Sequence, residues 1–323
     1  MNKIVIWIAL IIVMIGLLVL IILQRSSPFG KSNSSFFSDP SADITKIELS
    51  EGNRKISLIK ENGNWLINGN EDARKNGVLN LIRILQEIKI KSPVSPELFE
   101  SEVTSKGLIP IKVKVYEKRK LLKSFLVYKT RSNVYGNIMK INQQSKPFIV
   151  YMPGYEGDIG PGFIVNELFW QNYTLFNLMP SEISSVKLEN LSDTASSFSI
   201  INKNHHFVLS GTQPGHNAWD STLVTRYISY FARVPFESWA LELGDDQKKI
   251  IESQQPMYKL TVTTYANKET ILTLWARTKD NNGTQTNDTD RLWGKTQVHD
   301  ELFSIRYFDI DPILKKRSYF IRQ

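Results

Sequence analysis

The chain of 323 residues contains no cysteine and only four histidines. Without cysteine it forms no disulfide, binds no metal through thiolates and carries no lipid on a processed cysteine. His205 and His206 are neighbours, and neighbours on a strand point to opposite faces of a sheet. Neither these two nor His216 and His299 have the spacing of a metal site. We therefore expect no metal and no other cofactor.

Catalytic signatures are also missing from the sequence. Residues 154–162 are rich in glycine but lack the Lys-Ser/Thr of a phosphate loop and the spacing of a dinucleotide fingerprint, and no serine sits in a Gly-x-Ser-x-Gly elbow. Residues 280–290 are rich in acids and amides, but Gly283 holds the fourth place where a calcium loop needs glycine at the sixth, so we expect a solvated hairpin tip. The chain is not expected to be an enzyme. If the chain were an enzyme, the carboxylates expected to pair in space would be Asp220, Glu237, Asp245 and Asp246.

One long apolar run stands out against these absences. Residues 4–23 contain no charge, and twenty residues of helix span about 30 Å, the thickness of the hydrocarbon core of a bilayer. The run is longer than the apolar region of a cleaved signal peptide, and Leu23-Gln24-Arg25 is a poor cleavage site. We expect residues 1–24 to be an uncleaved transmembrane signal anchor and residues 25–42 a flexible spacer. The expected location is the bacterial inner membrane, crossed once, with the bulk of the chain in the periplasm.

Charge is distributed unevenly along the remaining chain. Residues 42–151 hold 20 Lys/Arg against 11 Asp/Glu, whereas residues 152–311 hold 13 against 20. The basic part therefore follows the predicted anchor, where lysines near an anionic lipid surface each contribute about 1 kcal/mol to binding. The acidic part and the anchor argue against a nucleic-acid partner.

The pattern of apolar residues predicts an α+β fold with two duplicated modules after the transmembrane helix. Alternating apolar residues predict strands from Ile44 and again from Ile111, and Asn62-Gly63 predicts a tight turn. Between these strands, helical spacing of apolar residues predicts one long amphipathic helix, and its apolar positions are Val78, Leu81, Ile82, Leu85 and Ile88. The same order recurs after residue 180, and a constant offset of 142 residues pairs residues 65–94 with 207–236. We expect modules of mainly antiparallel sheet at 43–151 (basic) and 181–323 (acidic, with a basic tail), joined by a Gly- and aromatic-rich connector at 152–180.

Short strings in this frame resemble an uncharacterised bacterial family of single-pass envelope proteins that carry a domain of unknown function. The strings are Ile-Thr-Lys-Ile at 44–47, Gly-Asn-Trp at 63–65, Lys-Ser-Pro-Val at 91–94, Phe-Ile-Val-Tyr-Met-Pro-Gly at 148–154 and Asn-Glu-Leu-Phe-Trp at 166–170. A related domain occurs in auxiliary proteins of gliding-motility-type ABC transporters. The resemblance implies a membrane-anchored accessory role, with a transporter as one partner, and it carries no catalytic residues over to this chain.

Two groups of residues are candidates for contacts. Basic clusters are candidates for binding lipid or a partner protein, and they comprise Lys118, Arg119 and Lys120, and Lys315, Lys316 and Arg317. Connector aromatics are candidates for binding a ligand or for packing between the modules, and they comprise Tyr155, Phe169 and Trp170. We expect an accessory or scaffold protein of a cell-envelope complex that binds other envelope proteins. The alternatives are an anchored enzyme that acts on envelope polysaccharide through paired carboxylates, and a ligand-binding module that uses the aromatic connector.

Overall fold

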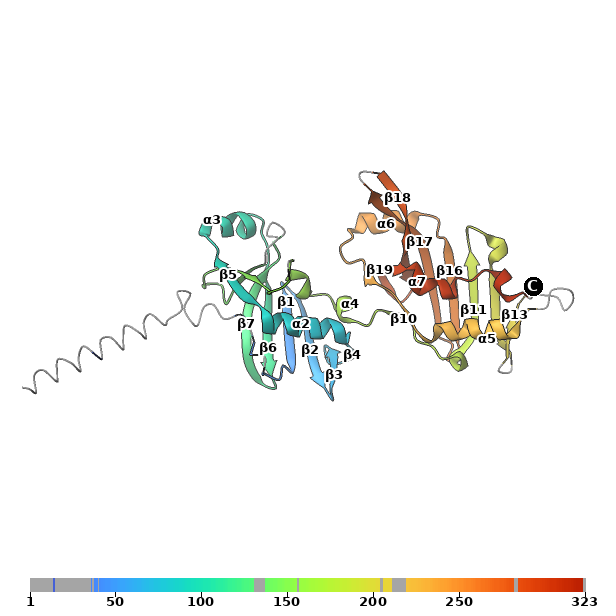
Figure 1. Ribbon diagram of the computed structural model, residues 1–323, viewed down its shortest axis with the longest axis horizontal. Coiled ribbons are helices and arrows are strands. Elements are labelled where there is room, and N and C mark those ends of the chain that lie inside the picture. The colour runs from blue at the N-terminus through green and yellow to red at the C-terminus, as the bar shows by residue number, and fades with distance from the viewer. Residues whose placement is uncertain are drawn as a thin grey trace, which may run out of the picture. The chain divides into compact units, whose positions relative to one another are not determined.

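The computed structural model describes residues 14, 36, 38–39, 41–130, 137–155, 157–203, 206–210, 219–281 and 284–321 (Figure 1). The chain divides into two compact units, unit 1 (Met1–Asn172) and unit 2 (Tyr173–Gln323). The boundary falls inside the expected connector, so residues 152–172 belong to unit 1 and residues 173–180 to unit 2.

Unit 1 is built on a nine-stranded antiparallel sheet with the order β4-β3-β2-β1-β6-β7-β8-β9-β5. Its strands are β1 (Lys46–Glu51), β2 (Arg54–Glu61), β3 (Asn64–Ile67), β4 (Glu71–Asp72), β5 (Lys89–Pro93), β6 (Ile111–Glu117), β7 (Lys120–Tyr128), β8 (Asn137–Lys140) and β9 (Phe148–Tyr151). Its helices are α2 (Lys75–Glu87), α3 (Pro96–Phe99), α4 (Glu167–Trp170), the π-turn Glu100–Thr104 and the 3-10 turn Gly160–Gly162.

Each face of this sheet has its own apolar cluster. On one face α2 buries Val78, Leu81, Ile84 and Leu85 in the main core, together with alternate residues of the strands such as Ile47 and Leu49. On the other face a smaller cluster lies under α3 and the π-turn, and it contains Val94, Val103, Leu126, Tyr128 and Ile138. Alternation of apolar and polar residues along each strand produces this arrangement, because successive side chains point to opposite faces.

Unit 2 has an eight-stranded antiparallel sheet with the order β13-β12-β11-β16-β17-β18-β19-β15 and a two-stranded sheet of β10 and β14. Its strands are β10 (Thr174–Phe176), β11 (Ile183–Asn190), β12 (Phe198–Lys203), β13 (His206–Leu209), β14 (Val234–Pro235), β15 (Ser238–Trp239), β16 (Tyr258–Thr264), β17 (Glu269–Asn281), β18 (Thr284–Thr296) and β19 (His299–Arg306). Its helices are α5 (Ser221–Ser229), α6 (Asp245–Ser253) and α7 (Tyr307–Ile310), with 3-10 turns at Pro180–Glu182, Thr194–Ser196, Tyr230–Ala232, Asp311–Ile313 and Arg317–Phe320.

The two sheets follow one strand order. Adding ten to each label of β3-β2-β1-β6-β7-β8-β9-β5 gives the order of the eight-stranded sheet, and β4 is an addition in unit 1. The offset of 142 residues places β3 onto β13, and the last residue of α2 onto the last residue of α5.

The expected fold class, with a long amphipathic helix in each module and an N-terminal transmembrane helix, is wrong about the helices. The described residues are mostly antiparallel sheet; α2 has 13 residues and α5 only 9, so neither unit has a long amphipathic helix. In unit 2 the cap at Asp220 begins the helix late, and a 3-10 turn follows it before Val234 pairs with Phe176 in a strand. Within the described residues, no helix combines the length and the apolar character needed to cross a bilayer. The residues expected to form the transmembrane anchor lie outside the described part of the chain, apart from Met14.

Candidate functional site

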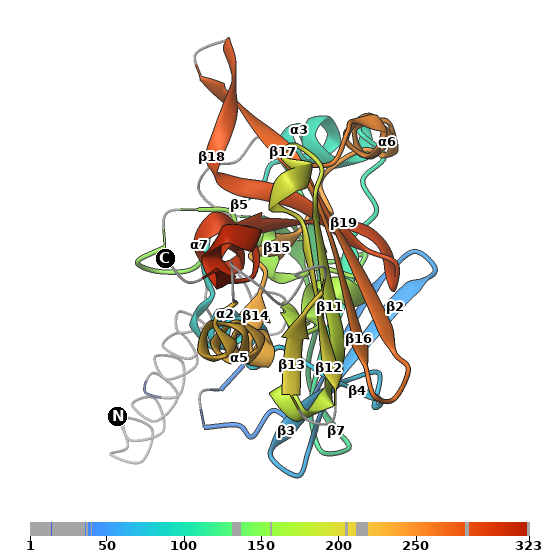
Figure 2. The ribbon, with the colours of Figure 1, turned by 90° about the vertical axis from the view of Figure 1, so that its right-hand side faces the viewer.

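The hairpin of β17 and β18 is longer than its neighbours and projects from unit 2. Only Glu269–Leu274 of this hairpin pair with β16, and only Arg291–Thr296 lie within the ladder to β19. Beyond these, residues 278–281 pair with residues 284–287 and, within the described chain, with no other strand. We call these eight residues the arm. In both views the ends of β17 and β18 reach past α6 and the other strands of unit 2 (Figure 1 and Figure 2).

The described side chains of the arm contribute nothing to an apolar core. Its sequence is Thr-Lys-Asp-Asn on β17 and Thr-Gln-Thr-Asn on β18, and Thr278, Lys279, Thr284 and Gln285 are exposed. Ordering a residue costs about 1–2 kcal/mol of backbone entropy, which elsewhere is offset by buried apolar surface. The arm therefore depends on its cross-strand pairing and on the way its base is held.

Arg277 holds the base of the arm, where the ladder is irregular. The register shifts between Ala276 and Thr278, so that Arg277 on β17 lies opposite residues 288–291 of β18. The guanidinium of Arg277 lies 4.5 Å from the centre of the Trp293 ring, and its Nη1 donates to Ser304 Oγ over 2.9 Å. Its Nε lies 3.5 Å from Asp288 Oδ2.

Asp288 was expected in a solvated tip, but its side chain is only 4% exposed. The additional residues on β18 form a bulge at this point, and Asp288 Oδ1 accepts the backbone N–H of Asp290 over 3.0 Å. The carboxylate thus closes the bulge and faces Arg277. A buried carboxylate is stabilised by such a cation, and removing the cation leaves the negative charge without compensation.

A second arginine extends this network across the sheet. Arg291 donates from Nε and Nη2 to the two oxygens of Glu237 over 2.6 and 2.9 Å, and Ser304 Oγ donates to Glu237 Oε2 over 3.1 Å. The hydrogen bond from Arg291 is the largest influence on Glu237 and holds the pKa of this carboxyl below its ordinary value, against the opposing effect of burial. We call the following residues the arm base: Glu237, Arg277, Asp288, Arg291, Trp293 and Ser304.

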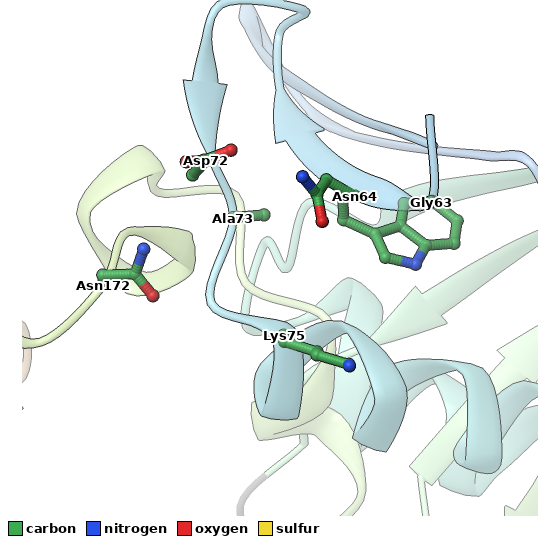
Figure 3. A pocket seen from close by; sticks show the side chains of 7 residues that line it. Gly63, Asn64, Asp72, Ala73, Lys75 and Asn172 are labelled. Atoms are coloured by element: carbon green, nitrogen blue, oxygen red, sulfur yellow. The ribbon is translucent and has the colours of Figure 1, made fainter. Parts of the chain in front are cut away.

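Unit 1 contains a small open pocket at the start of α2 (Figure 3). Its volume is about 220 Å³, and its lining residues are Gly63, Asn64, Trp65, Asp72, Ala73, Lys75 and Asn172. Trp65 is 7% exposed, so its ring offers little surface to a ligand. Pockets for drug-sized ligands measure about 300–1,000 Å³. The pocket therefore suits a few water molecules or a small ion better than an organic substrate.

The predicted basic clusters differ in their surroundings. Lys118, Arg119 and Lys120 are all exposed around the turn between β6 and β7, and the N–H of Lys118 donates to Thr45 Oγ1. Lys315 Nζ, by contrast, lies 2.7 Å from Asp311 Oδ2.

The other two residues of the C-terminal cluster also lie against unit 2. Lys316 Nζ lies 3.5 Å from Asp193 Oδ2, and Arg317 is half-buried at the start of a 3-10 turn. The turn at 118–120 is thus the more accessible of the two basic clusters.

The predicted aromatic residues all belong to unit 1. Tyr155 is 48% exposed, whereas Trp170 is fully buried and donates from its indole Nε1 to the carbonyl of Ile164 over 2.8 Å. Phe169 is half-buried, with its ring centre 4.9 Å from that of Trp170 and 5.2 Å from the guanidinium of Arg74. Trp170 therefore has a core position, and Tyr155 is the most exposed of the three.

The predicted carboxylates have structural partners. Asp220 accepts the N–H of Thr222 over 2.8 Å and caps α5, and Asp245 and Asp246 occupy the first turn of α6, where the helix dipole favours negative charge. Among the described residues there is no group of three metal-ligating side chains.

The histidines have different placements. His299 packs on Trp239 at 5.2 Å between ring centres, and His206 is exposed. His205 and His216 lie outside the described residues.

Sequence reasoning named Glu237 as a candidate carboxylate, but it missed the other members of the arm base and the pairing of Glu237 with Arg291, because these residues come from four distant segments. Arg291 and Glu237 are 54 residues apart, and Arg277 and Ser304 are 27 apart. The available signal was the alternation of residues 269–296 on both sides of a polar turn, which marks an unusually long hairpin. No family model, no curated protein and no solved structure matches the chain.

Proposed function

We propose that the protein is a membrane-attached accessory protein of a bacterial envelope complex, without catalytic activity, which contacts a partner protein through the arm. The observation that carries this proposal is the arm itself. It is a polar hairpin whose described side chains join no apolar core, yet the arm base fixes its direction through two arginines and two carboxylates.

The arm suits contact with another protein because both of its outer edges present backbone groups. An exposed edge of this kind can pair with an extended segment of a partner, and side chains along it then determine specificity. Lys279 and Gln285 are exposed on opposite strands and provide a charged and a polar contact. The absence of apolar residues from the arm reduces non-specific association, so the partner is recognised by hydrogen bonds rather than by hydrophobic burial.

Membrane attachment is supported by the uncharged apolar segment at residues 4–23. The resemblance to single-pass envelope proteins supports the periplasmic side of the inner membrane, and it makes an ABC transporter a reasonable partner. The basic residues 42–151 follow the apolar segment directly, which favours a position of unit 1 near anionic lipid.

Site-specific crosslinking tests the proposal. A photo-crosslinking amino acid at Lys279, in the arm, is compared with the same amino acid at Lys249, which is exposed on α6 of the same unit. In membranes of the source bacterium, we expect a discrete crosslinked protein from position 279 and none from position 249. The Arg277→Ala change in the same chain should weaken the product, because the arm loses its fixed direction. Equal products from both positions, or none from position 279, would contradict the proposal.

A further inference from the structure

Four lysines gather on the face of the unit 1 sheet opposite α2. Lys46 lies on β1, Lys55 on β2, and Lys112 and Lys114 on β6, the three adjacent strands at the centre of the basic module. The only carboxylate among them is Glu48 on β1. We call these five residues the lysine face.

The strand register places these side chains side by side. Glu48 is paired with Lys114 across one ladder, and Ser50 is paired with Lys55 on one side and Lys112 on the other. Directly paired residues point to the same face of a sheet, and their Cβ atoms lie about 4.5–5.5 Å apart. The apolar residues between them, such as Ile47, are fully buried on the opposite face.

The charge of the lysine face is only partly neutralised. Glu48 Oε1 lies 2.7 Å from Lys46 Nζ and 3.4 Å from Lys55 Nζ, and its side chain is mostly buried between them. Lys112 and Lys114 form no ion pair with any described residue, and Lys55 and Lys112 are exposed. Four lysines around one carboxylate leave three positive charges uncompensated on this face of β2, β1 and β6, beside the cluster under α3. The exposed turn at Lys118–Lys120 continues this charge at the end of β6.

We propose that the lysine face binds the anionic headgroups of the membrane to which the protein is attached. This inference rests on the membrane attachment proposed above and adds which surface meets the lipid. Phe36 is buried in the main core of unit 1, and the N–H of Ser38 donates to the carbonyl of Leu85, so only 12 residues separate Leu23, at the end of the apolar segment, from the packed part of unit 1. A segment of this length reaches at most roughly 40 Å, so the lysine face stays at high local concentration near the bilayer.

The absence of native cysteine allows a single label to report on the lysine face. Ser50→Cys, between Lys55 and Lys112, carries a fluorophore, and Ser199→Cys, half-buried on β12 of unit 2, is the matched control. The full chain is reconstituted into phosphatidylcholine vesicles with or without phosphatidylglycerol, and both contain a lipid with a nitroxide-labelled headgroup. We expect strong quenching at position 50 only with the anionic lipid. This quenching should disappear in 1 M salt, where the Debye length is about 3 Å.

Charge variants test the lysines themselves. The triple change K55Q/K112Q/K114Q should lower the ratio of lipid-bound to free lysine face by about a hundredfold, since each lysine near anionic lipid contributes about fivefold. The control K187Q/K259Q/K268Q removes three lysines of unit 2 and should leave quenching unchanged. The triple change K55R/K112R/K114R keeps the charge and should keep the quenching. This variant separates loss of charge from loss of folding.

The outcomes separate this inference from the function on which it rests. If the full chain does not float with neutral vesicles, membrane attachment itself is wrong. If the chain floats but position 50 is quenched equally with and without anionic lipid, only the lysine face is refuted. A triple glutamine variant that keeps its lipid quenching but loses a crosslinked protein partner would also refute it, because the lysines would then bind protein.

Discussion

Replacing Arg277 by alanine is expected to loosen the arm while unit 2 stays folded. Three interactions disappear together: the stack on Trp293 at 4.5 Å, the hydrogen bond to Ser304 at 2.9 Å and the ion pair with Asp288 at 3.5 Å. All three lie at the register shift where the arm leaves the sheet. The core strands of unit 2 keep their buried apolar residues, so the change acts mainly on the arm.

The magnitude follows from these three interactions. The stack contributes about 0.5–1 kcal/mol and the hydrogen bond about 1 kcal/mol. The ion pair adds about 1 kcal/mol, a modest value because the Arg277 side chain remains 29% exposed to screening solvent. The sum is about 3 kcal/mol of local stability. Asp288→Asn in the Arg277→Ala background should recover about 1 kcal/mol, because a neutral amide replaces the buried, unpaired carboxylate.

Hydrogen exchange measures this local stability directly. About 3 kcal/mol corresponds to exchange roughly a hundredfold faster for protected amides of residues 278–281 and 284–287. Amides of β11 and β12, which are three and four strands away from β18 in the sheet order, should exchange as before. Arg277→Lys is the matched control: it keeps the charge but loses the planar stack and the forked donors, so its exchange rates should fall between those of the wild type and the alanine variant.

Unchanged exchange of the arm in the alanine variant would refute the reasoning, because something other than Arg277 would then order the hairpin. Equal acceleration throughout unit 2 would refute it in a different way. It would show that Arg277 supports the whole sheet and that the arm has no separate stability.

Other substitutions test the core and the charge pairs of unit 2. A Cβ on Gly294 would overlap the Phe303 ring, so Gly294→Ala should destabilise the protein by about 1–3 kcal/mol in thermal unfolding, and Phe303→Leu in the same chain should recover part of this loss. Tyr227→Phe removes a buried hydrogen bond of 2.9 Å to a backbone carbonyl, and urea unfolding should show a loss of about 1–3 kcal/mol. The folded pKa of Glu237 is lowered, so the stability that it contributes is present above the ordinary pKa of 4.5 and is lost as pH falls through the folded value. Glu237→Gln should therefore make stability less dependent on pH in this acidic range, and an unchanged acid slope would show that the Arg291 pair has no effect on the titration.

The sequence predicted buried faces better than it predicted lengths of elements. Helical spacing marks Val78, Leu81 and Leu85, and all three are fully buried under the sheet of unit 1. The spacing says nothing about where the chain leaves the helix. Ile88 already has an extended conformation, because the following residues pair with β9, and this limits α2 to 13 residues.

The sequence likewise predicts which charged residues share one face of a strand, but not which strands lie side by side. The alternation Lys112-x-Lys114 predicts that both lysines share one face of a strand. It does not predict that β6 lies beside β1, which brings Lys46 and Glu48 to the same surface. The arm base depends even more on distant pairing, since Glu237 and Arg291 meet only when β15 pairs with β19 and β19 pairs with β18. Sequence distance hides such sites because each residue alone looks like ordinary surface.

The shared strand order suggests why the two candidate surfaces lie in different units. In unit 1 the hairpin strands β7 and β8 have 9 and 4 residues, whereas β17 and β18 in unit 2 have 13 each, which leaves room for the arm. At the position of Lys112 and Lys114 on β6, unit 2 has Lys259 and Thr261 on β16, so one charge replaces two. Strand order fixes the core, while strand length and outward side chains remain free to differ without loss of buried apolar surface. Differences at these free positions give one sheet a cationic surface and the other a projecting polar hairpin, which are the two surfaces that we propose bind lipid and a partner protein.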